Sequence, residues 1–219
     1  MTKYIAHRGA SKKFIENTYY AFKYAYESSF DGCECDIRIT KDQAFIVHHD
    51  EHLLRLNHVN KSIKSLTLLE ILSYHYQDGQ RIMTLESLLH LHANFNKTLL
   101  IEVKDALSND EMTYLYKLLS SINTEKIKII SFHLDVIIFF KQYLSVMYLK
   151  DELDEKDINK LIELDICSIN LNIQYYEQSK HVMYKKYQFD ISYWTVDDKR
   201  LYPLLEKDEV YFITTNIVE

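Results

Sequence analysis

The sequence has few of the residues that break or cross-link a chain. Among its 219 residues there are only three glycines, one proline and three cysteines. Turns therefore have to be formed by Asn, Asp, Ser and Lys, and each glycine marks a position to examine. The odd number of cysteines, Cys33, Cys35 and Cys167, argues against a disulfide framework and predicts reduced thiols in a cytoplasmic protein.

Long apolar runs and an excess of positive charge are also missing. The longest apolar run, Val136 to Phe140, is far below the ~18 residues that a membrane-spanning helix needs. The N-terminus has no apolar stretch of the kind found in signal peptides. We therefore expect neither membrane insertion nor export. Lys and Arg number 26 against 32 Asp and Glu, a formal net charge of −6, which argues against a nucleic-acid binder.

What the chain does have is an alternation of short apolar runs and longer segments with helical spacing. This pattern is typical of βα units on a parallel sheet. Strands are predicted at 3–6, 33–37, 99–103, 127–131, 146–149, 167–171, 191–195 and 210–214. Helices are predicted at 17–28, 84–93, 109–121, 133–143, 155–163, 175–187 and 197–206. Eight strands favour a compact (β/α)8 barrel formed by a single domain over 1–219, although an open doubly wound sheet also alternates in this way.

Two irregularities interrupt this repeat. Residues 38–48 have the pattern of a hairpin, and the polar stretch 51–82 is predicted to be a small insertion that caps the strand ends. After the last predicted strand we expect no eighth helix, so the groove between the first and last helices would be under-covered. A second subunit is one candidate to fill that groove, and the oligomeric state is left open.

The second predicted strand contains Cys33-Glu34-Cys35-Asp36. Successive side chains of a strand point to opposite faces, so the two thiols share one face and the two carboxylates share the other. Two ionised carboxylates are costly under a helix layer, whereas free cysteine is often buried there. We therefore expect Glu34 and Asp36 to face the barrel interior. A metal–thiolate site is disfavoured because no second pair of cysteines completes it.

Glu102 and Lys104 repeat the same alternation in the third predicted strand. Their charges are expected to converge with those of Glu34 and Asp36. Three carboxylates at neighbouring strand ends form an oxygen cage suited to Mg²⁺ or Ca²⁺, since carboxylates so close together need a cation to stay ionised. The alternative interpretation is a structural ion pair of Glu102 with Lys104 or with Arg8.

Two histidine segments follow predicted strands. His7-Arg8-Gly9 ends the first strand, where Arg8 is suited to grip phosphate through two parallel hydrogen bonds and Gly9 to turn the backbone. In His48-His49-Asp50 only one of the two imidazoles can point inward. Two histidines on either side of a phosphodiester are what acid–base cleavage requires. A solvated or metal-scavenging pair remains the alternative for His48 and His49.

Several common catalytic motifs do not occur in the sequence. There is no Gly-rich phosphate loop, no Gly-x-Ser-x-Gly elbow and no paired Cys-x-x-Cys. Nucleotide hydrolysis, serine hydrolysis and a zinc finger therefore have no support.

Taken together, the segments resemble the glycerophosphodiester phosphodiesterase family from end to end. The matching segments, in the family's order and spacing, are Ala6-His7-Arg8-Gly9-Ala10-Ser11, Glu16-Asn17-Thr18, Glu34-x-Asp36, His49-Asp50-x-x-Leu53, Thr84-Leu85-Glu86, Ile101-Glu102-Val103-Lys104, Ser131-Phe132 and Trp194-Thr195-Val196-Asp197. The resemblance implies a barrel with a small insertion, dependence on a divalent metal, and hydrolysis of a small-molecule glycerophosphodiester to glycerol 3-phosphate and an alcohol.

The resemblance also assigns roles to individual positions. It implies metal ligation by Glu34, Asp36 and Glu102 and acid–base catalysis by His7 and His49. Substrate or phosphate binding is implied for Arg8, Glu16, Lys104 and Trp194. Two alternatives stay open: a related phosphodiesterase that acts on lysophospholipids, and a catalytically inactive barrel that binds a phosphate metabolite.

Overall fold

The chain forms a closed barrel of parallel strands in the computed structural model, which describes residues 1–217. Around the ring the order is β1, β10, β9, β8, β7, β6, β5 and β2, and β2 pairs with β1 to close it. These strands are β1 Lys3–Ala6, β2 Gly32–Ile39, β5 Thr98–Val103, β6 Ile127–Ser131, β7 Ser145–Lys150, β8 Ser168–Asn172, β9 Asp190–Trp194 and β10 Phe212–Thr215. The predicted (β/α)8 architecture is confirmed, and the pairing of β1 with β2 excludes the open sheet.

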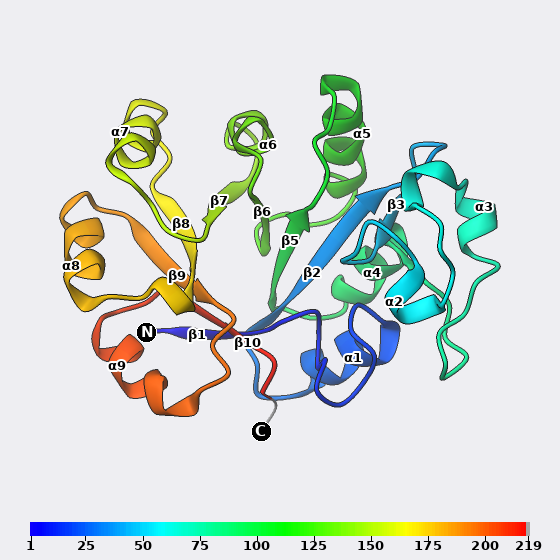
Figure 1. Cartoon of the computed structure of the whole chain (residues 1–219), viewed down its shortest axis with the longest axis horizontal. Helices are drawn as coiled ribbons and strands as arrows, with labels where there is room; N and C mark the ends of the chain where they lie inside the picture. Colours follow the sequence, from blue (N-terminus) through cyan, green and yellow to red (C-terminus); the bar gives the residue numbers. More distant parts are fainter. Residues whose placement is uncertain (218–219) are drawn as a thin grey trace.

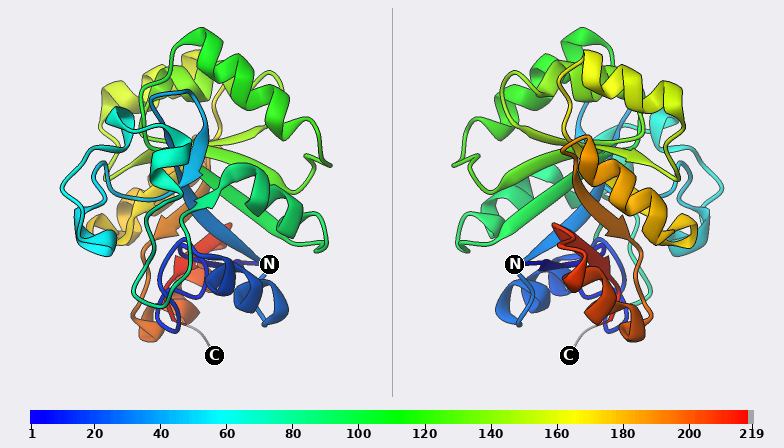
Figure 2. Two further views of the ribbon diagram at one scale, coloured as in Figure 1. Left: turned by 90° about the vertical axis from the view of Figure 1, so that its right-hand side faces the viewer. Right: turned by 90° about the vertical axis from the view of Figure 1, so that its left-hand side faces the viewer.

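Seven of the helices that the structure describes in residues 1–217 surround the ring, as Figure 1 illustrates. They are α1 Tyr19–Glu27, α4 Leu85–His92, α5 Asn109–Leu119, α6 Leu134–Phe140, α7 Glu155–Glu163, α8 Gln178–Lys186 and α9 Tyr202–Lys207. Each lies where the sequence pattern predicted a helix. Figure 2 shows α7, α8 and α9 covering the side of the barrel opposite the insertion.

Helix boundaries follow from capping and from apolar spacing. The Ser108 hydroxyl accepts a hydrogen bond from the Glu111 backbone N–H at 3.3 Å, and the Glu111 carboxylate accepts one from the Ser108 N–H at 2.7 Å. This reciprocal cap starts α5, and Met112, Leu115 and Leu119 then form the stripe that α5 buries.

Within residues 1–217, no helix follows β10. A groove of about 320 Å³ lies between the end of α1 and α9, as expected from that gap, and its walls include Phe30, Tyr202 and Ile217. That a second subunit covers this groove stays a prediction. Within residues 1–217, every helix is too short or too polar to cross a bilayer.

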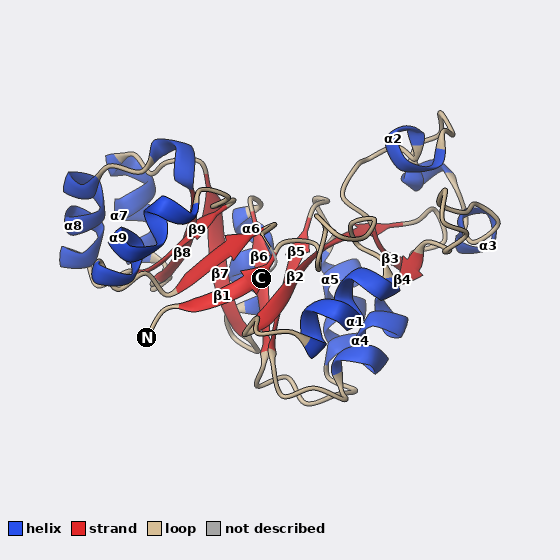
Figure 3. Cartoon of the chain, turned by 90° about the horizontal axis from the view of Figure 1, so that it is seen from below, coloured by secondary structure: helices blue, strands red, loops and turns tan. Residues whose placement is uncertain are grey.

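The predicted hairpin is confirmed. Beyond the ring, β2 pairs in antiparallel fashion with β3 (Phe45–Val47), which in turn pairs with β4 (Met83–Thr84). The insertion, residues 51–82, contains α2 (Leu54–Asn57), a 3₁₀ turn (Ile63–Ser65) and α3 (Leu68–Ile71), and it stands out from the barrel (Figure 3). It has a small apolar core of its own, formed by Ile46, Leu53, Ile63, Leu66, Ile71, Tyr76 and Ile82. Two further 3₁₀ turns, Ile173–Tyr175 and Lys199–Leu201, follow β8 and precede α9.

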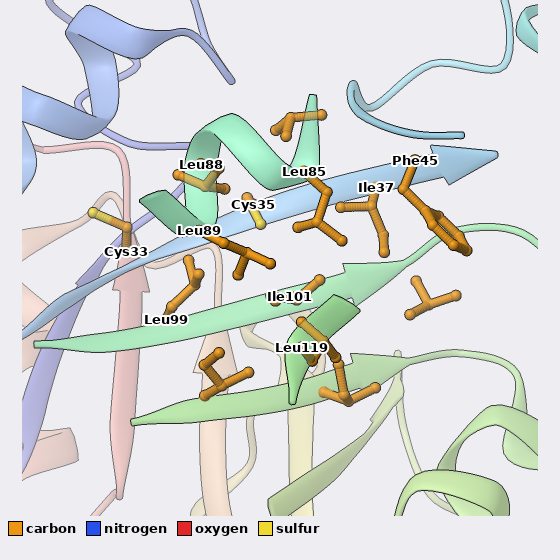
Figure 4. Close-up of a cluster of buried hydrophobic side chains, with 14 of the residues drawn as sticks. Cys33, Cys35, Ile37, Phe45, Leu85, Leu88, Leu89, Leu99, Ile101 and Leu119 are labelled. Carbon is orange, nitrogen blue, oxygen red and sulfur yellow. The ribbon is translucent and has the colours of Figure 1, made fainter. Parts of the chain in front are cut away.

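The two faces of β2 have opposite surroundings. Cys33 and Cys35 are fully buried and belong to the apolar cluster that contains Leu85, Leu88 and Leu89 of α4 (Figure 4). As predicted, the thiols therefore face the helix layer. Because side chains alternate along a strand, this register turns Glu34 and Asp36 into the barrel.

An apolar plug closes the centre of the barrel. Its buried members are Ile5, Leu100, Ile130, Met147, Leu149 and Phe212, with Trp194 packed against them. These side chains fill the interior, so a ligand can enter only at the carboxyl ends of the strands, where the loops of a (β/α)8 barrel form active sites.

Candidate active site

A pocket of about 150 Å³ opens above the plug at the carboxyl ends of the strands. It brings together seven of the nine predicted site residues, drawn from β2, β5 and β9 and from the loops that follow β1, β3 and β5. The lining comprises His7, Arg8, Glu34, His49, Glu102, Lys104, Ile130, Phe132, Leu149, Asn170, Trp194, Thr195 and Thr214. Of the remaining two predicted residues, Asp36 is fully buried beside the pocket and Glu16 lies behind Arg8.

Three carboxylates converge at one wall of the pocket. Glu34 and Asp36 come from β2, Glu102 comes from β5, and the register pairs Asp36 with Glu102. One oxygen from each lies within 4.8 Å of the others. Glu34 Oε1 and Asp36 Oδ1 are buried and have no hydrogen-bond partner. Carboxylate oxygens are the ligands that a hard divalent cation prefers, and two of these accept no hydrogen bond, so the donor set fits Mg²⁺ or Ca²⁺.

The three carboxylates ionise unequally. Burial, together with the charges of Asp36 and Glu102, raises the pKa of Glu34 well above its usual range. Burial and Asp36 raise the pKa of Glu102 to about 7. Burial also disfavours the charged form of Asp36, but Arg8 and Lys104 outweigh it and lower the pKa of Asp36 to about 2. A dication bound among them favours ionisation of all three, because it offsets their mutual repulsion.

Lys104 adds a positive charge to the same wall. Its Nζ lies 2.7 Å from Glu102 Oε1 and 3.6 Å from Asp36 Oδ1. The Glu102–Lys104 ion pair that the sequence left as an alternative is therefore present, and it coexists with the carboxylate cluster. Both carboxylates raise the pKa of Lys104 against the opposing effect of burial, so the ammonium stays charged.

Arg8 is fixed by contacts on several sides. Its Nε lies 3.1 Å from Asp36 Oδ2, its Nη1 donates to Glu16 Oε1 at 3.0 Å, and its backbone N–H donates to Glu34 Oε2 at 3.0 Å. The backbone turns through positive φ at Arg8 (56°) and Gly9 (72°). A Cβ on Gly9 would lie 2.7 Å from the carbonyl carbon of Ala21, so only glycine fits there without a shift of α1.

His7 is oriented by a residue from the opposite end of the chain. Its Nδ1 lies 2.8 Å from Asn216 Oδ1, and the amide nitrogen of Asn216 donates to Asp197 Oδ2 at 2.9 Å. Since the Asp197 carboxylate can only accept, the amide oxygen must face His7 and Nδ1 must carry the proton. Burial and then Arg8 lower the pKa of His7 to about 4, so Nε2 is an unprotonated base near neutral pH.

The second imidazole at the pocket is His49, and not its neighbour His48. His49 Nδ1 donates to Asp50 Oδ1 at 2.8 Å, and Asp50 Oδ2 accepts from Arg55 Nε at 2.6 Å. Burial lowers the pKa of His49. His48 is buried and its ring hydrogen-bonds to the backbone carbonyl of Asp50 at 3.0 Å. This is the alternation expected from the sequence, with one imidazole of the pair directed to the pocket.

Glu16 supports the site from outside the pocket. Its carboxylate accepts hydrogen bonds from Arg8 at 3.0 Å and from Arg55 at 2.6 Å. Arg55 belongs to α2, so the insertion is tied to both Arg8 and the Asp50–His49 pair. Glu16 therefore does not line the pocket, and its contacts are with Arg8 and Arg55.

The pocket wall formed by β8, β9 and β10 carries no charged side chain among the described residues that line the pocket. Phe132 and Trp194 meet edge to face with ring centroids 5.8 Å apart, and Phe132 is 41% exposed. The Trp194 indole donates to the backbone oxygen of Asn170 at 3.3 Å. The predicted site residue Trp194 thus lies in an aromatic, uncharged part of the pocket.

Sequence reasoning did not single out several residues that hold the site together. They are Asn17, Arg55 and Asn216. Asn17 Nδ2 donates a hydrogen bond to Asp36 Oδ2 at 2.8 Å, and the Asn17 backbone has a positive φ of 58°. Asn17 lies in a segment that carries the family resemblance, which was its only signal. The partner of Asn216 is 209 residues away, and no local pattern reveals such a contact.

Comparison with known proteins agrees with this geometry. The profile of the Glycerophosphoryl diester phosphodiesterase family matches residues 7–219. A glycerophosphodiester phosphodiesterase of Caldanaerobacter subterraneus is 37% identical over 113 residues, 48% of this chain and 46% of that protein. The human Lysophospholipase D GDPD1 is 40% identical over 74 residues, 34% of this chain and 24% of that protein. The chain spans about half, or less, of the length of the curated relatives it matches.

Solved structures share the same barrel. A phosphodiesterase of Oleispira antarctica, determined with the product sn-glycerol-3-phosphate, has a TM-score of 0.91 and 18% identity, covering 99% of this chain and 93% of that one. At this identity the similarity shows the fold alone, and it agrees with the closed ring described above.

Proposed function

Because the chain belongs to the glycerophosphoryl diester phosphodiesterase family, we propose that it hydrolyses glycerophosphodiesters to glycerol 3-phosphate and an alcohol. One observation carries the proposal: His7 and His49 line the same pocket as the carboxylate cluster of Glu34, Asp36 and Glu102. A cation site with an imidazole acid–base pair is what cleavage of a phosphodiester needs.

Glu34, Asp36 and Glu102 would hold the divalent cation, Mg²⁺ or Ca²⁺. When bound there, the cation supplies electrostatic stabilisation to the phosphoryl oxygens. Arg8 and Lys104 line the pocket beside the carboxylates and neutralise part of the negative charge of the phosphate.

His7 and His49 divide the two proton transfers. One imidazole, neutral, takes the proton of the attacking hydroxyl, which belongs either to water or to the substrate's own glycerol moiety, and the other enters the step as an imidazolium and gives its Nε2 proton to the leaving oxygen. For His7, the hydrogen bond from Nδ1 to Asn216 leaves Nε2 as the atom that exchanges the proton. For His49, Asp50 holds Nδ1 in the same way.

We further propose that residues 1–219 are one catalytic domain and that the insertion caps its site. The contacts of Arg55 with Glu16 and Asp50 support this, because they connect the insertion to the residues around the pocket. The free thiols, two of them buried, support a reducing, cytoplasmic location.

A second candidate function is hydrolysis of lysophospholipids. The exposed ring of Phe132 beside Trp194 favours it, since an acyl chain needs apolar surface near the pocket. The insertion argues against it, because most of its large apolar side chains are turned into its own core. The third candidate, an inactive phosphate-binding barrel, is disfavoured by the intact carboxylate cluster.

One set of assays separates the three candidates. The purified protein is incubated with glycerophosphocholine, glycerophosphoethanolamine or lysophosphatidylcholine, each with Mg²⁺, Ca²⁺ or EDTA. We expect release of glycerol 3-phosphate from the first two substrates with a divalent cation and none with EDTA. Preferential choline release from lysophosphatidylcholine would support the second candidate, and no hydrolysis of any substrate would support the third.

A further inference from the structure

A chain of alternating charges connects Arg8 with His49, and its centre lies in the insertion. Arg8 Nη1 donates to Glu16 Oε1 at 3.0 Å. Arg55 Nη2 donates to the same oxygen at 2.6 Å, and its Nη1 donates to Glu16 Oε2 at 3.2 Å. Arg55 Nε donates to Asp50 Oδ2 at 2.6 Å, and Asp50 Oδ1 accepts the Nδ1 proton of His49 at 2.8 Å. Arg55 on α2 therefore contacts both carboxylates that hold side chains of the pocket.

The two carboxylates of this chain stay ionised although they are partly buried. Burial disfavours the charged form of Glu16, but Arg55 and then Arg8 outweigh it and lower the pKa of Glu16. For Asp50, burial is outweighed by the hydrogen bonds from Arg55 and then from His49, and the pKa of Asp50 is also lowered. Arg55 thus supplies the positive charge that keeps both groups anionic, as strong hydrogen-bond acceptors.

We propose that Arg55 is a positioning residue for catalysis, an assignment that rests on the proposed function. It does not line the pocket, so it acts through its two carboxylate partners. Through Asp50 it holds the imidazole of His49 for proton transfer. Through Glu16 it holds the guanidinium of Arg8 for the phosphate. A single side chain of the insertion thereby fixes both groups.

The geometry of these contacts is specific to arginine. The guanidinium is planar and carries its N–H groups on more than one edge, so Nε serves Asp50 while Nη1 and Nη2 serve Glu16. The paired contact also fixes the plane of the Glu16 carboxylate. A lysine has a single ammonium on a flexible chain and cannot hold two carboxylates in these directions.

Loss of Arg55 is expected to leave the surrounding backbone in place. The insertion has an apolar core of its own. The backbone oxygen of His49 is held separately, because it accepts a hydrogen bond from Arg38 Nε at 2.8 Å. Arg8 keeps its contact with Asp36 at 3.1 Å. The side chains of His49 and Arg8 would therefore gain freedom to rotate in a folded protein, which separates positioning from a structural role.

The test measures kcat and KM separately for glycerophosphocholine with Mg²⁺ or Ca²⁺. We expect Arg55→Gln to lower kcat roughly 10- to 100-fold through His49 and to raise KM roughly fivefold through Arg8. Asp50→Asn interrupts the branch to His49 and should chiefly lower kcat. Glu16→Gln interrupts the branch to Arg8 and should chiefly raise KM.

Double variants show whether Arg55 acts through these carboxylates. Added to Asp50→Asn, Arg55→Gln is expected to lower kcat by less than about twofold more, because groups in one network are not additive. Added to Glu16→Gln, it is expected to raise KM by less than about twofold more. A full additional loss in either double variant would overturn the proposal. So would a change in only one of the two constants, or in neither, for Arg55→Gln alone.

Arg81→Gln is the matched control. Arg81 is an exposed arginine of the insertion whose Nε hydrogen-bonds to His75 at 3.3 Å, and it does not line the pocket. It is expected to change neither constant. If the melting temperature shows that Arg55→Gln is unfolded, Arg55→Lys decides. This variant keeps the charge without the two-sided contact, so kcat/KM should fall roughly fivefold or more, and wild-type kcat/KM would contradict the proposal.

A spectroscopic readout separates this proposal from the proposed function. If the wild-type protein hydrolyses neither glycerophosphocholine nor glycerophosphoethanolamine, the proposed function fails, and ¹⁵N NMR of the histidine side chains takes the place of the assay. The His49 signals are identified by their absence in His49→Gln. We expect a proton fixed on Nδ1 in the wild type and exchange between both ring nitrogens in Arg55→Gln. An unchanged tautomer in Arg55→Gln rules out the positioning role.

Discussion

The two walls of the pocket are built on different principles. The wall formed by β1, β2 and β5 contains three carboxylates, a guanidinium and an ammonium, and each cation lies within 3.6 Å of a carboxylate oxygen. The wall formed by β8, β9 and β10 presents an amide, a hydroxyl and an indole, with no charged side chain among the described residues that line the pocket. On the proposed function, the charged wall carries the reaction, and the uncharged wall contacts the part of the substrate that does not react.

This segregation has a physical cause. A buried charge is tolerated only beside partners that stabilise it, so the charged groups gather on adjacent strands. A single charge on β8 or β9 would be separated from those partners by at least one strand. The uncharged side chains of β8, β9 and β10 do not need a charged partner, so they can line the pocket away from the carboxylates.

The largest effect is expected in the charged wall, on replacing Glu34 by Gln. Loss of this carboxylate weakens the cation site and the charge stabilisation that it provides, which is worth several kcal/mol. We expect kcat/KM for glycerophosphocholine to fall roughly 10⁴-fold with Mg²⁺ or Ca²⁺ present. Glu155→Gln, at an exposed position on α7, is the control and should be neutral. More than a tenth of wild-type activity in Glu34→Gln would contradict the role of the carboxylate.

His49→Ala is expected to have the next largest effect. It removes one of the two groups that transfer protons, so kcat should fall roughly 10³-fold, within the range of 10²–10⁴ typical of general acid–base catalysis. His52→Ala, an exposed histidine three residues along the chain, should leave kcat unchanged in the same steady-state assay. Near-normal turnover by His49→Ala would refute its part in the mechanism.

Asn216→Leu tests the connection between the chain's end and the charged wall. Leucine cannot accept the proton of His7 Nδ1, so the imidazole loses its fixed tautomer while all groups of the charged wall stay in place. We expect kcat to fall roughly 10- to 100-fold with KM within threefold of wild type, as for other residues that orient a catalytic ligand. A rise in KM at constant kcat would instead assign Asn216 to substrate binding.

The smallest effect is expected in the uncharged wall, from Phe132→Ala. Its ring covers the edge of Trp194 but carries no charge, so its loss should raise KM a few-fold and leave kcat within twofold. Steady-state kinetics on glycerophosphocholine provides both constants. A loss of kcat comparable to that of His49→Ala would show that the two walls do not divide the work as described.

Much of the architecture could be predicted from local patterns. Alternating apolar runs and helical segments gave eight strands within two residues of their observed bounds, and the alternation of Cys33-Glu34-Cys35-Asp36 gave the correct faces of β2. These predictions succeed because strand geometry fixes the direction of each side chain.

The supporting contacts could not be predicted in this way. Asn216 reaches His7 only because β10 lies beside β1 in the closed ring, and Arg55 reaches Glu16 only after the insertion has folded. Asn170 and Thr214 look like ordinary polar residues within strands, and only the folded barrel shows that Asn170 Oδ1 and Thr214 Oγ1 are buried without a hydrogen-bond partner. Such features depend on tertiary structure and leave no periodic trace in the sequence.

The register of β2 also constrains how this protein can change in length. Gain or loss of one residue at the start of β2, before Cys33, would rotate every following side chain to the other side of the sheet, bringing sulfur into the pocket and carboxylates under α4. No compensating substitution at a single position could restore both faces. Evolution can therefore lengthen or shorten the loops around this barrel, but the residue count of this one strand must stay constant.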